Sequence, residues 1–82
     1  MATIITEITG ILRGVLHDPE LELVPATYFD DLTGWEAMDM VAVVVEVECR
    51  FDVQFELPEI DRLTTVGDLL RMITAKQARA AA

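Results

Sequence analysis

The sequence is short of basic residues. Six Lys and Arg residues stand against fifteen Asp and Glu residues, which gives a net charge of −9 at pH 7. Such a charge repels phosphate backbones and anionic lipid head groups, so nucleic acid and membrane surfaces are poor partners. A protein with a basic surface is the better candidate, because complementary charge speeds encounter and sets orientation.

Cysteine and histidine are equally scarce. Cys49 is the only cysteine and His17 the only histidine, so neither an internal disulfide nor a zinc site is expected. No apolar run reaches the roughly 18 residues of a membrane span, and the first residues lack the basic start of a signal peptide. We therefore expect a protein of the reducing cytoplasm that does not insert into membranes.

What the sequence does have is enough apolar material for a small core. Of its 82 residues, 52% are hydrophobic and 26% are charged, a balance that excludes intrinsic disorder. The length suits one domain over residues 1–82 and leaves no room for a second.

Three stretches predict main helices. A stripe of apolar residues at helical spacing predicts the first over residues 3–16. Residues 36–51 contain five valines, which favour strands, but sixteen residues without Gly or Pro exceed a typical strand and favour a helix. Thr65, followed three residues later by Asp68, is typical of a capped start and predicts the third helix over residues 65–76.

The remaining segments connect these helices. Residues 17–35 lack periodicity and predict a long ordered loop, packed through Leu21, Leu23, Val24, Tyr28, Phe29 and Leu32. Residues 58–63 begin with proline and predict one short helix. Residues 77–82 predict a fraying tail. The expected fold is therefore all-α, with three main helices, one short helix and a long first loop.

The second helix carries the most information about function. On a helical wheel it has an apolar arc, a charged arc and a third, mostly apolar arc. The first contains Met40, Val43, Val44, Val47 and Phe51, the second Asp39, Glu46 and Arg50, and the third Met38, Val41, Ala42, Val45, Glu48 and Cys49. Either the helix is buried on two sides, or the third arc contacts a partner. Trp35, just before this helix, either covers the loop or contacts a partner.

No set of residues suits catalysis or metal binding. The acidic residues from Asp30 to Asp39 lack the alternating oxygen ligands and the glycine of a calcium loop. His17 has no nucleophile near it in the sequence, and Cys49 is more typical of a small apolar residue than of a reactive thiol. We expect no catalytic residue, no metal ligand and no enzymatic activity.

Three blocks of sequence resemble the acyl carrier protein family. They are Asp31-Leu-Thr-Gly-Trp-Glu-Ala-Met-Asp-Met-Val41, Glu46-Val-Glu-Cys-Arg-Phe-Asp52 and Thr64-Thr-Val-Gly-Asp-Leu-Leu70. Their order and spacing match that family from about residue 28 to residue 73. The resemblance implies a small acidic bundle of three main helices and one short one.

The resemblance also implies a prosthetic group. Family members carry phosphopantetheine on a serine at the start of the second helix, within an Asp-Ser-Leu or Asp-Ser-Met motif. Here the motif reads Glu36-Ala37-Met38, so Ala37 stands at the serine position. A phosphodiester link needs a hydroxyl, and phosphopantetheine cannot be attached to an alanine methyl group. Either Ala37 is an engineered change that holds the apo form, which we favour, or it is natural in a degenerate carrier kept for binding alone.

The implied function is a shuttle for thioester-bound acyl groups between enzymes of fatty-acid, polyketide or related synthesis. The implied partners are a phosphopantetheinyl transferase and acyl-transferring or aminoacyl-transferring enzymes with basic docking surfaces, with the chain acting as a monomer. The residues implied to face them are Glu36, Met38, Asp39, Val41, Ala42, Val45 and Glu48. An aminoacyl or peptidyl carrier is one alternative, and an interaction module without a prosthetic group is another.

Overall fold

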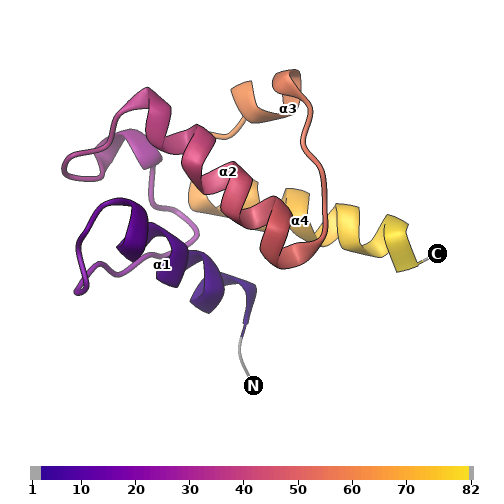
Figure 1. Ribbon diagram of the computed structural model, residues 1–82, viewed down its shortest axis with the longest axis horizontal. Helices are drawn as coiled ribbons and strands as arrows, with labels where there is room; N and C mark the ends of the chain where they lie inside the picture. The colour runs from indigo at the N-terminus through magenta and orange to yellow at the C-terminus, as the bar shows by residue number, and fades with distance from the viewer. Residues whose placement is uncertain (1–2, 82) are drawn as a thin grey trace.

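The structure is a computed structural model that describes residues 3–81, which form four α-helices and one short 3-10 helix. In chain order the elements are α1 (Ile4–Val15), η1 (Phe29–Asp31), α2 (Ala37–Phe51), α3 (Leu57–Asp61) and α4 (Val66–Ala81). Figure 1 shows α2 crossing above α1, with α4 behind them. The all-α prediction is confirmed, since the described residues form no strand beyond one isolated bridge between Tyr28 and Thr65.

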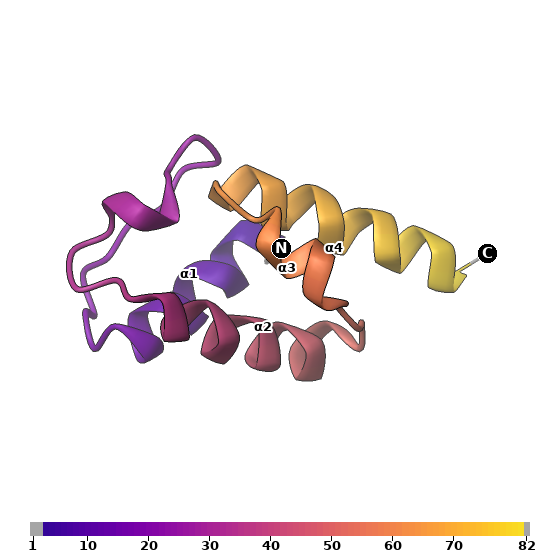
Figure 2. The same cartoon turned by 90° about the horizontal axis from the view of Figure 1, so that it is seen from above.

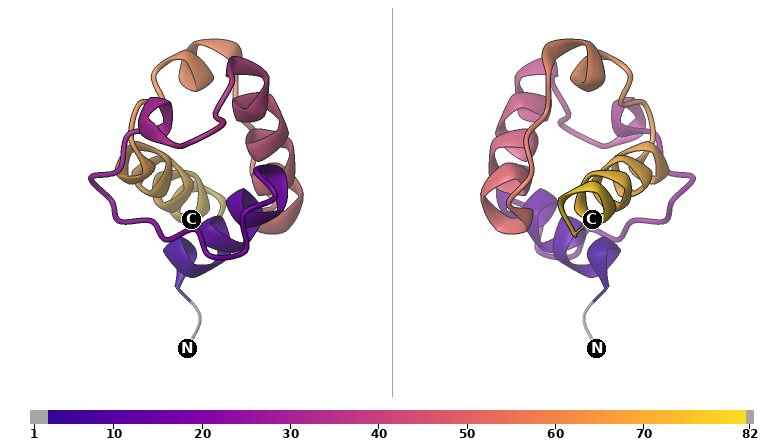
Figure 3. Two further views of the ribbon diagram at one scale, coloured as in Figure 1. Left: turned by 90° about the vertical axis from the view of Figure 1, so that its left-hand side faces the viewer. Right: turned by 90° about the vertical axis from the view of Figure 1, so that its right-hand side faces the viewer.

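The short helix α3 lies between α2 and α4 in the view from above (Figure 2). Seen from either end of the molecule, α1 lies opposite α3, and the long first loop closes the side opposite α2 (Figure 3). None of the helices within residues 3–81 is long and apolar enough to cross a membrane.

The helix boundaries differ from the predicted ones by a few residues. α2 begins at Ala37 because Glu36 is its N-cap, with extended backbone angles. α3 spans Leu57–Asp61 and is shifted toward the N-terminus of the predicted segment 58–63, since Glu56 caps it. α4 continues past residue 76 to Ala81, so residues 77–81, predicted to fray, are its last turns. Residue 82 lies outside the described residues.

Most of the core consists of apolar side chains that the helical spacing had placed on one face of a predicted helix; Phe29, Val53 and Leu63 lie outside those stripes. In α1 the buried residues are Ile8, Ile11 and Leu12, and the inner face of α2 contributes Val43, Val44 and Val47. The remaining buried members are Phe29, Val53, Leu63, Val66, Leu69 and Ile73. Valine favours strands because it is β-branched. In α2, the burial of Val43, Val44 and Val47 in the core outweighs this preference, and the segment is a helix.

The first loop is ordered by packing, as the sequence predicted, although with fewer contacts. Phe29 is buried, and Leu21, Leu23 and Leu32 are partly buried against the core. Val24 and Tyr28, which we had expected to pack the loop, are exposed. The sequence did not predict η1, a single turn that brings Phe29 into the core.

Candidate functional site

The start of α2 presents position 37 to solvent. Ala37 is the first residue of the helix and is exposed, as are Glu36 before it and Met38 after it. Asp39, in the third helical position, accepts a hydrogen bond from the backbone N–H of Glu36 at 2.8 Å and so fixes the entry of the chain into the helix. Position 37 therefore lies at a capped helix start and is exposed to solvent.

The third arc of α2 is exposed rather than buried. Met38 is 80% exposed, Val41 58% and Val45 51%, and Ala42 and Cys49 are exposed as well. We call Met38, Val41, Ala42 and Val45 the α2 outer face. Large apolar side chains grouped on one helix face are typical of an interaction surface. Of the two interpretations left open by the helical wheel, burial on two sides is therefore wrong.

The acids around the α2 outer face differ in what they contact. Glu36 and Glu46 are exposed, whereas Asp39 and Glu48 are half-buried. Glu48 accepts a hydrogen bond from the backbone N–H of Phe55 at 2.9 Å, so its carboxylate also fixes the connection between α2 and α3. These four acids rim the α2 outer face, and the Glu48 carboxylate also contacts the connection to α3.

One exposed apolar residue escaped the sequence analysis. Leu57, the first residue of α3, is 78% exposed. The sequence offers no signal for this, because a leucine before a proline in a short helix is equally compatible with burial. The contact between Glu48 and Phe55 places the chain just before Leu57 beside the α2 outer face, because Glu48 continues the arc of Val41 and Val45.

Trp35 covers the loop. Its ring stacks on the buried ring of Phe29, with centroids 5.2 Å apart and an interplanar angle of 21°. This pair links η1 to the residue just before the N-cap of α2 and so helps to position that helix start.

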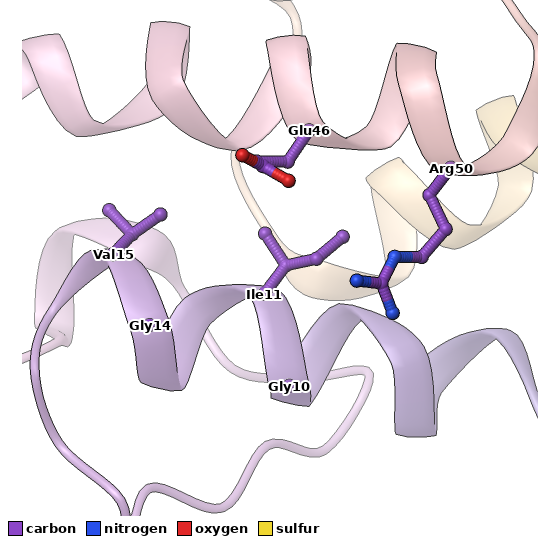
Figure 4. A pocket seen from close by; sticks show the side chains of 6 residues that line it. All are labelled: Gly10, Ile11, Gly14, Val15, Glu46 and Arg50. Carbon is purple, nitrogen blue, oxygen red and sulfur yellow. The ribbon is translucent and has the colours of Figure 1, made fainter.

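An open groove of about 320 Å³ lies on the other side of α2, where the helix packs on α1. Gly10 and Gly14 leave room for it, and Glu46 and Arg50 extend over it from α2 (Figure 4). Its walls carry no nucleophile and no cluster of acids. Within residues 3–81, no group of three or more His, Cys, Asp or Glu side chains is placed to hold a metal ion.

A small all-α bundle with a long first loop, and a second helix whose outer face is exposed and rimmed by acids, is the arrangement that the resemblance to acyl carrier proteins implies. The chain matches the family described as "Phosphopantetheine attachment site" over residues 6–73. Its fold is similar to the solution structure of a holo acyl carrier protein from Geobacter metallireducens, with a TM-score of 0.84 and 28% sequence identity. That match covers 94% of this chain and 88% of the other. The chain therefore belongs to the phosphopantetheine attachment family, whose members are carriers and not enzymes.

Phosphopantetheine is the expected cofactor of this family. The residues present do not fit its attachment, because the 82 residues contain no serine at any position and Ala37 offers only a methyl group. From residue 34 to residue 63 there is also no threonine or tyrosine, so no neighbour on α2 or α3 supplies a hydroxyl instead. A phosphodiester to this helix is chemically impossible in the chain as it stands.

Proposed function

We propose that the chain is an apo form of an acyl-carrier-type protein whose α2 outer face docks on enzymes with basic surfaces. The single observation that supports this most is the exposed apolar face of α2, rimmed by acids, next to position 37 in a fold of the carrier family. A net charge of −9 steers such a face toward Arg-rich or Lys-rich surfaces. With serine at position 37, the same scaffold would carry thioester-bound acyl groups of fatty-acid, polyketide or related synthesis.

The proposal also includes the compartment, the oligomeric state and the cargo of the protein. A single cysteine and the absence of a spanning helix within residues 3–81 support a cytoplasmic protein. The α2 outer face has four residues, against about 20–30 residues on each side of a stable interface, which supports a monomer that binds its partners transiently. Aminoacyl or peptidyl cargo is the alternative within the carrier class.

A second candidate function is an interaction module that never carries a prosthetic group. The observation that favours it is Glu36, which stands where the family motif has aspartate, directly before Ala37. A single engineered serine-to-alanine change would not alter this neighbour.

Intact-mass measurement separates the two candidates. The parent chain and Ala37→Ser are each incubated with coenzyme A and a broad-specificity phosphopantetheinyl transferase. We expect one added phosphopantetheine on Ala37→Ser and no added mass on the parent, because only the variant has a hydroxyl at the helix start. Circular dichroism spectra of both chains serve as the folding control. If neither chain gains mass while both are folded, the carrier proposal fails and the interaction module takes its place.

A further inference from the structure

The fold requires two of its four glycines and does not require the other two. Gly34 has a φ of 80°, and a Cβ atom on Gly67 would collide with the carbonyl oxygen of Pro25. Gly10 and Gly14 have no positive φ, and nothing lies within 4 Å of a Cβ atom built on either of them. Each nevertheless weakens α1, because glycine is the poorest helix former after proline. The packing of the chain on itself therefore does not account for these two glycines.

Both of these glycines line the open groove between α1 and α2. Ile11, which is buried, and Val15, which is partly buried, line the same groove and make it apolar. Because glycine has no side chain, the backbone of another segment can approach α1 closely along the groove. The groove therefore has the shape and the apolar lining that a further helix needs to pack on α1 and α2.

Two opposite charges extend over the groove from α2. Glu46 and Arg50 lie one helical turn apart, and both are exposed. Neither forms an ion pair within residues 3–81, where the two ion pairs are Arg71 with Asp68 and Lys76 with Glu59. Figure 4 shows the Ile11 side chain between the Glu46 carboxylate and the Arg50 guanidinium. Both charges are thus available to groups outside the chain.

The charges around the groove cancel, in contrast to those of the whole chain. Glu46 and Arg50 sum to zero, and the exposed residues of α1, which are Thr6, Gly10, Arg13 and Gly14, include no acid. A partner therefore needs no excess of basic residues here, unlike at the α2 outer face. A second copy of this chain is a poor occupant, because two chains of charge −9 repel each other.

We propose that the groove between α1 and α2 binds a helix of a partner protein. This helix lies against Gly10 and Gly14 and places apolar side chains on Ile11. It carries a basic residue opposite Glu46 and, one turn away, an acidic residue opposite Arg50. The inference goes beyond the proposed function and does not rest on it, because the groove and the α2 outer face lie on different sides of α2. A partner in the groove leaves the α2 outer face free for a second protein.

A synthetic helical peptide tests this. The striped peptide is an alanine-based helix of about 18 residues, roughly five turns, with a stripe of leucines beside a Lys and a Glu that stand one turn apart. The control peptide has the same composition, with these residues scattered around the helix. Amide chemical shifts of the isotope-labelled parent chain report where and how tightly each peptide binds. We expect the striped peptide to bind about tenfold more tightly than the control and to shift residues 10–15, 46 and 50, while residues 38 and 41 keep their shifts.

Gly14→Leu tests the close approach to α1. Its side chain fills the space that the bound helix needs, so we expect the striped peptide to bind at least about tenfold more weakly. The fold should survive, since nothing lies within 4 Å of a Cβ atom built on Gly14. Thr74→Leu is the matched control, because it adds a leucine at an exposed position of α4, and its affinity should stay within about twofold of the parent. If circular dichroism shows Gly14→Leu to be unfolded, Gly10→Leu fills the same groove and is measured instead.

Glu46→Gln and Arg50→Gln test the two charge contacts. The first variant makes the chain one unit less acidic and the second one unit more acidic, so an effect of net charge alone would have opposite signs in the two. Loss of a direct contact weakens binding in both. We expect the striped peptide to bind each variant about twofold to fivefold more weakly than the parent, as the loss of an exposed ion pair does.

Several outcomes would overturn this inference. They are equal affinity for the striped and control peptides, shifts confined to the α2 outer face, parent-like affinity of the folded leucine variant, and opposite changes in the two glutamine variants. Shifts of residues 10–15 that grow with chain concentration without peptide would also overturn it, because a second copy of the chain would then occupy the groove. The mass of Ala37→Ser is independent of all these results, so the proposed function stands or fails separately.

Discussion

The starts of α2 and α4 share one device and differ in what surrounds it. In both helices an aspartate in the first turn accepts the backbone N–H of the N-cap residue: Asp39 binds Glu36 at 2.8 Å, and Asp68 binds Thr65 at 3.0 Å. At α4 the bond is reciprocated, because the Thr65 hydroxyl accepts the N–H of Asp68 at 3.1 Å. Each helix is thus fixed at its entry by local hydrogen bonds.

The next N–H groups show the difference. At α4, Val66 donates to the carbonyl of Thr27 at 2.9 Å and Gly67 to that of Pro25 at 2.8 Å, so the helix start is joined to the first loop. At α2, the corresponding residues Ala37 and Met38 are exposed. The two helix starts have similar caps but different surroundings. The start of α4 is bonded to the first loop, whereas the start of α2 is accessible at the candidate site.

We call the contact of Val66 and Gly67 with Thr27 and Pro25 the α4 joint. Filling the space at this joint should have the largest effect on stability. A Cβ atom on Gly67 would lie 2.9 Å from the carbonyl oxygen of Pro25, a backbone atom that cannot turn aside. We expect Gly67→Ala to lower the free energy of unfolding by about 1–3 kcal/mol, because the clash outweighs the gain in helix propensity. Urea denaturation followed by circular dichroism measures it.

Gly14→Ala provides the control for Gly67→Ala, since nothing lies within 4 Å of a Cβ atom built on Gly14. In this α1 position the methyl group meets no obstacle, so the variant should be stabilised by up to about 1 kcal/mol. Equal effects of the two substitutions would mean that the close approach of Pro25 does not shape the joint.

The α4 joint also shows which parts of the fold the sequence could predict and which it could not. The spacing of Ile8, Ile11 and Leu12 predicts α1, and the Thr65–Asp68 pair predicts the start of α4, because both signals lie within one or two helical turns. The closeness of Gly67 to Pro25 depends on packing between segments far apart in sequence, which no local pattern encodes. The same applies to η1, whose turn follows from the burial of Phe29.

The candidate site was likewise predictable in its local pattern but not in its packing. The helical wheel grouped Met38, Val41 and Val45, but only the packed structure shows that no other element covers them within residues 3–81. It also reveals that Glu48 holds the loop before α3, a role that charge alone does not indicate. The partner roles of these residues stay a prediction.

Substituting the N-cap residues of α4 and α2 by alanine should lower stability by a smaller amount than Gly67→Ala. Thr65 is half-buried and short, so its hydroxyl loses little freedom on binding the Asp68 N–H, and Thr65→Ala should cost about 1 kcal/mol. Glu36 is exposed and long, and glutamate is not among the strongest capping residues, so Glu36→Ala should cost less than about 0.5 kcal/mol. Thermal melts at pH 7 give both values. A larger loss from Glu36→Ala would show that the α2 start is the more tightly built of the two.

The smallest expected effect is a pH dependence at the α4 joint. Hydrogen bonds from the backbone N–H groups of Thr65 and Thr64 hold the pKa of Asp68 below its ordinary value of 3.8. A folded-state pKa below the unfolded one stabilises the fold fully above the unfolded value, and this stabilisation is lost as the pH falls through the folded pKa. Asp68→Asn should therefore be less stable than the parent at pH 7, by less than Thr65→Ala, and the difference should shrink below about pH 4. Asp30→Asn removes one exposed carboxylate from η1 and controls for the change in net charge. If the Asp68→Asn difference stays constant from pH 7 to pH 3, the joint depends on the shape of the Asp68 side chain and not on its charge.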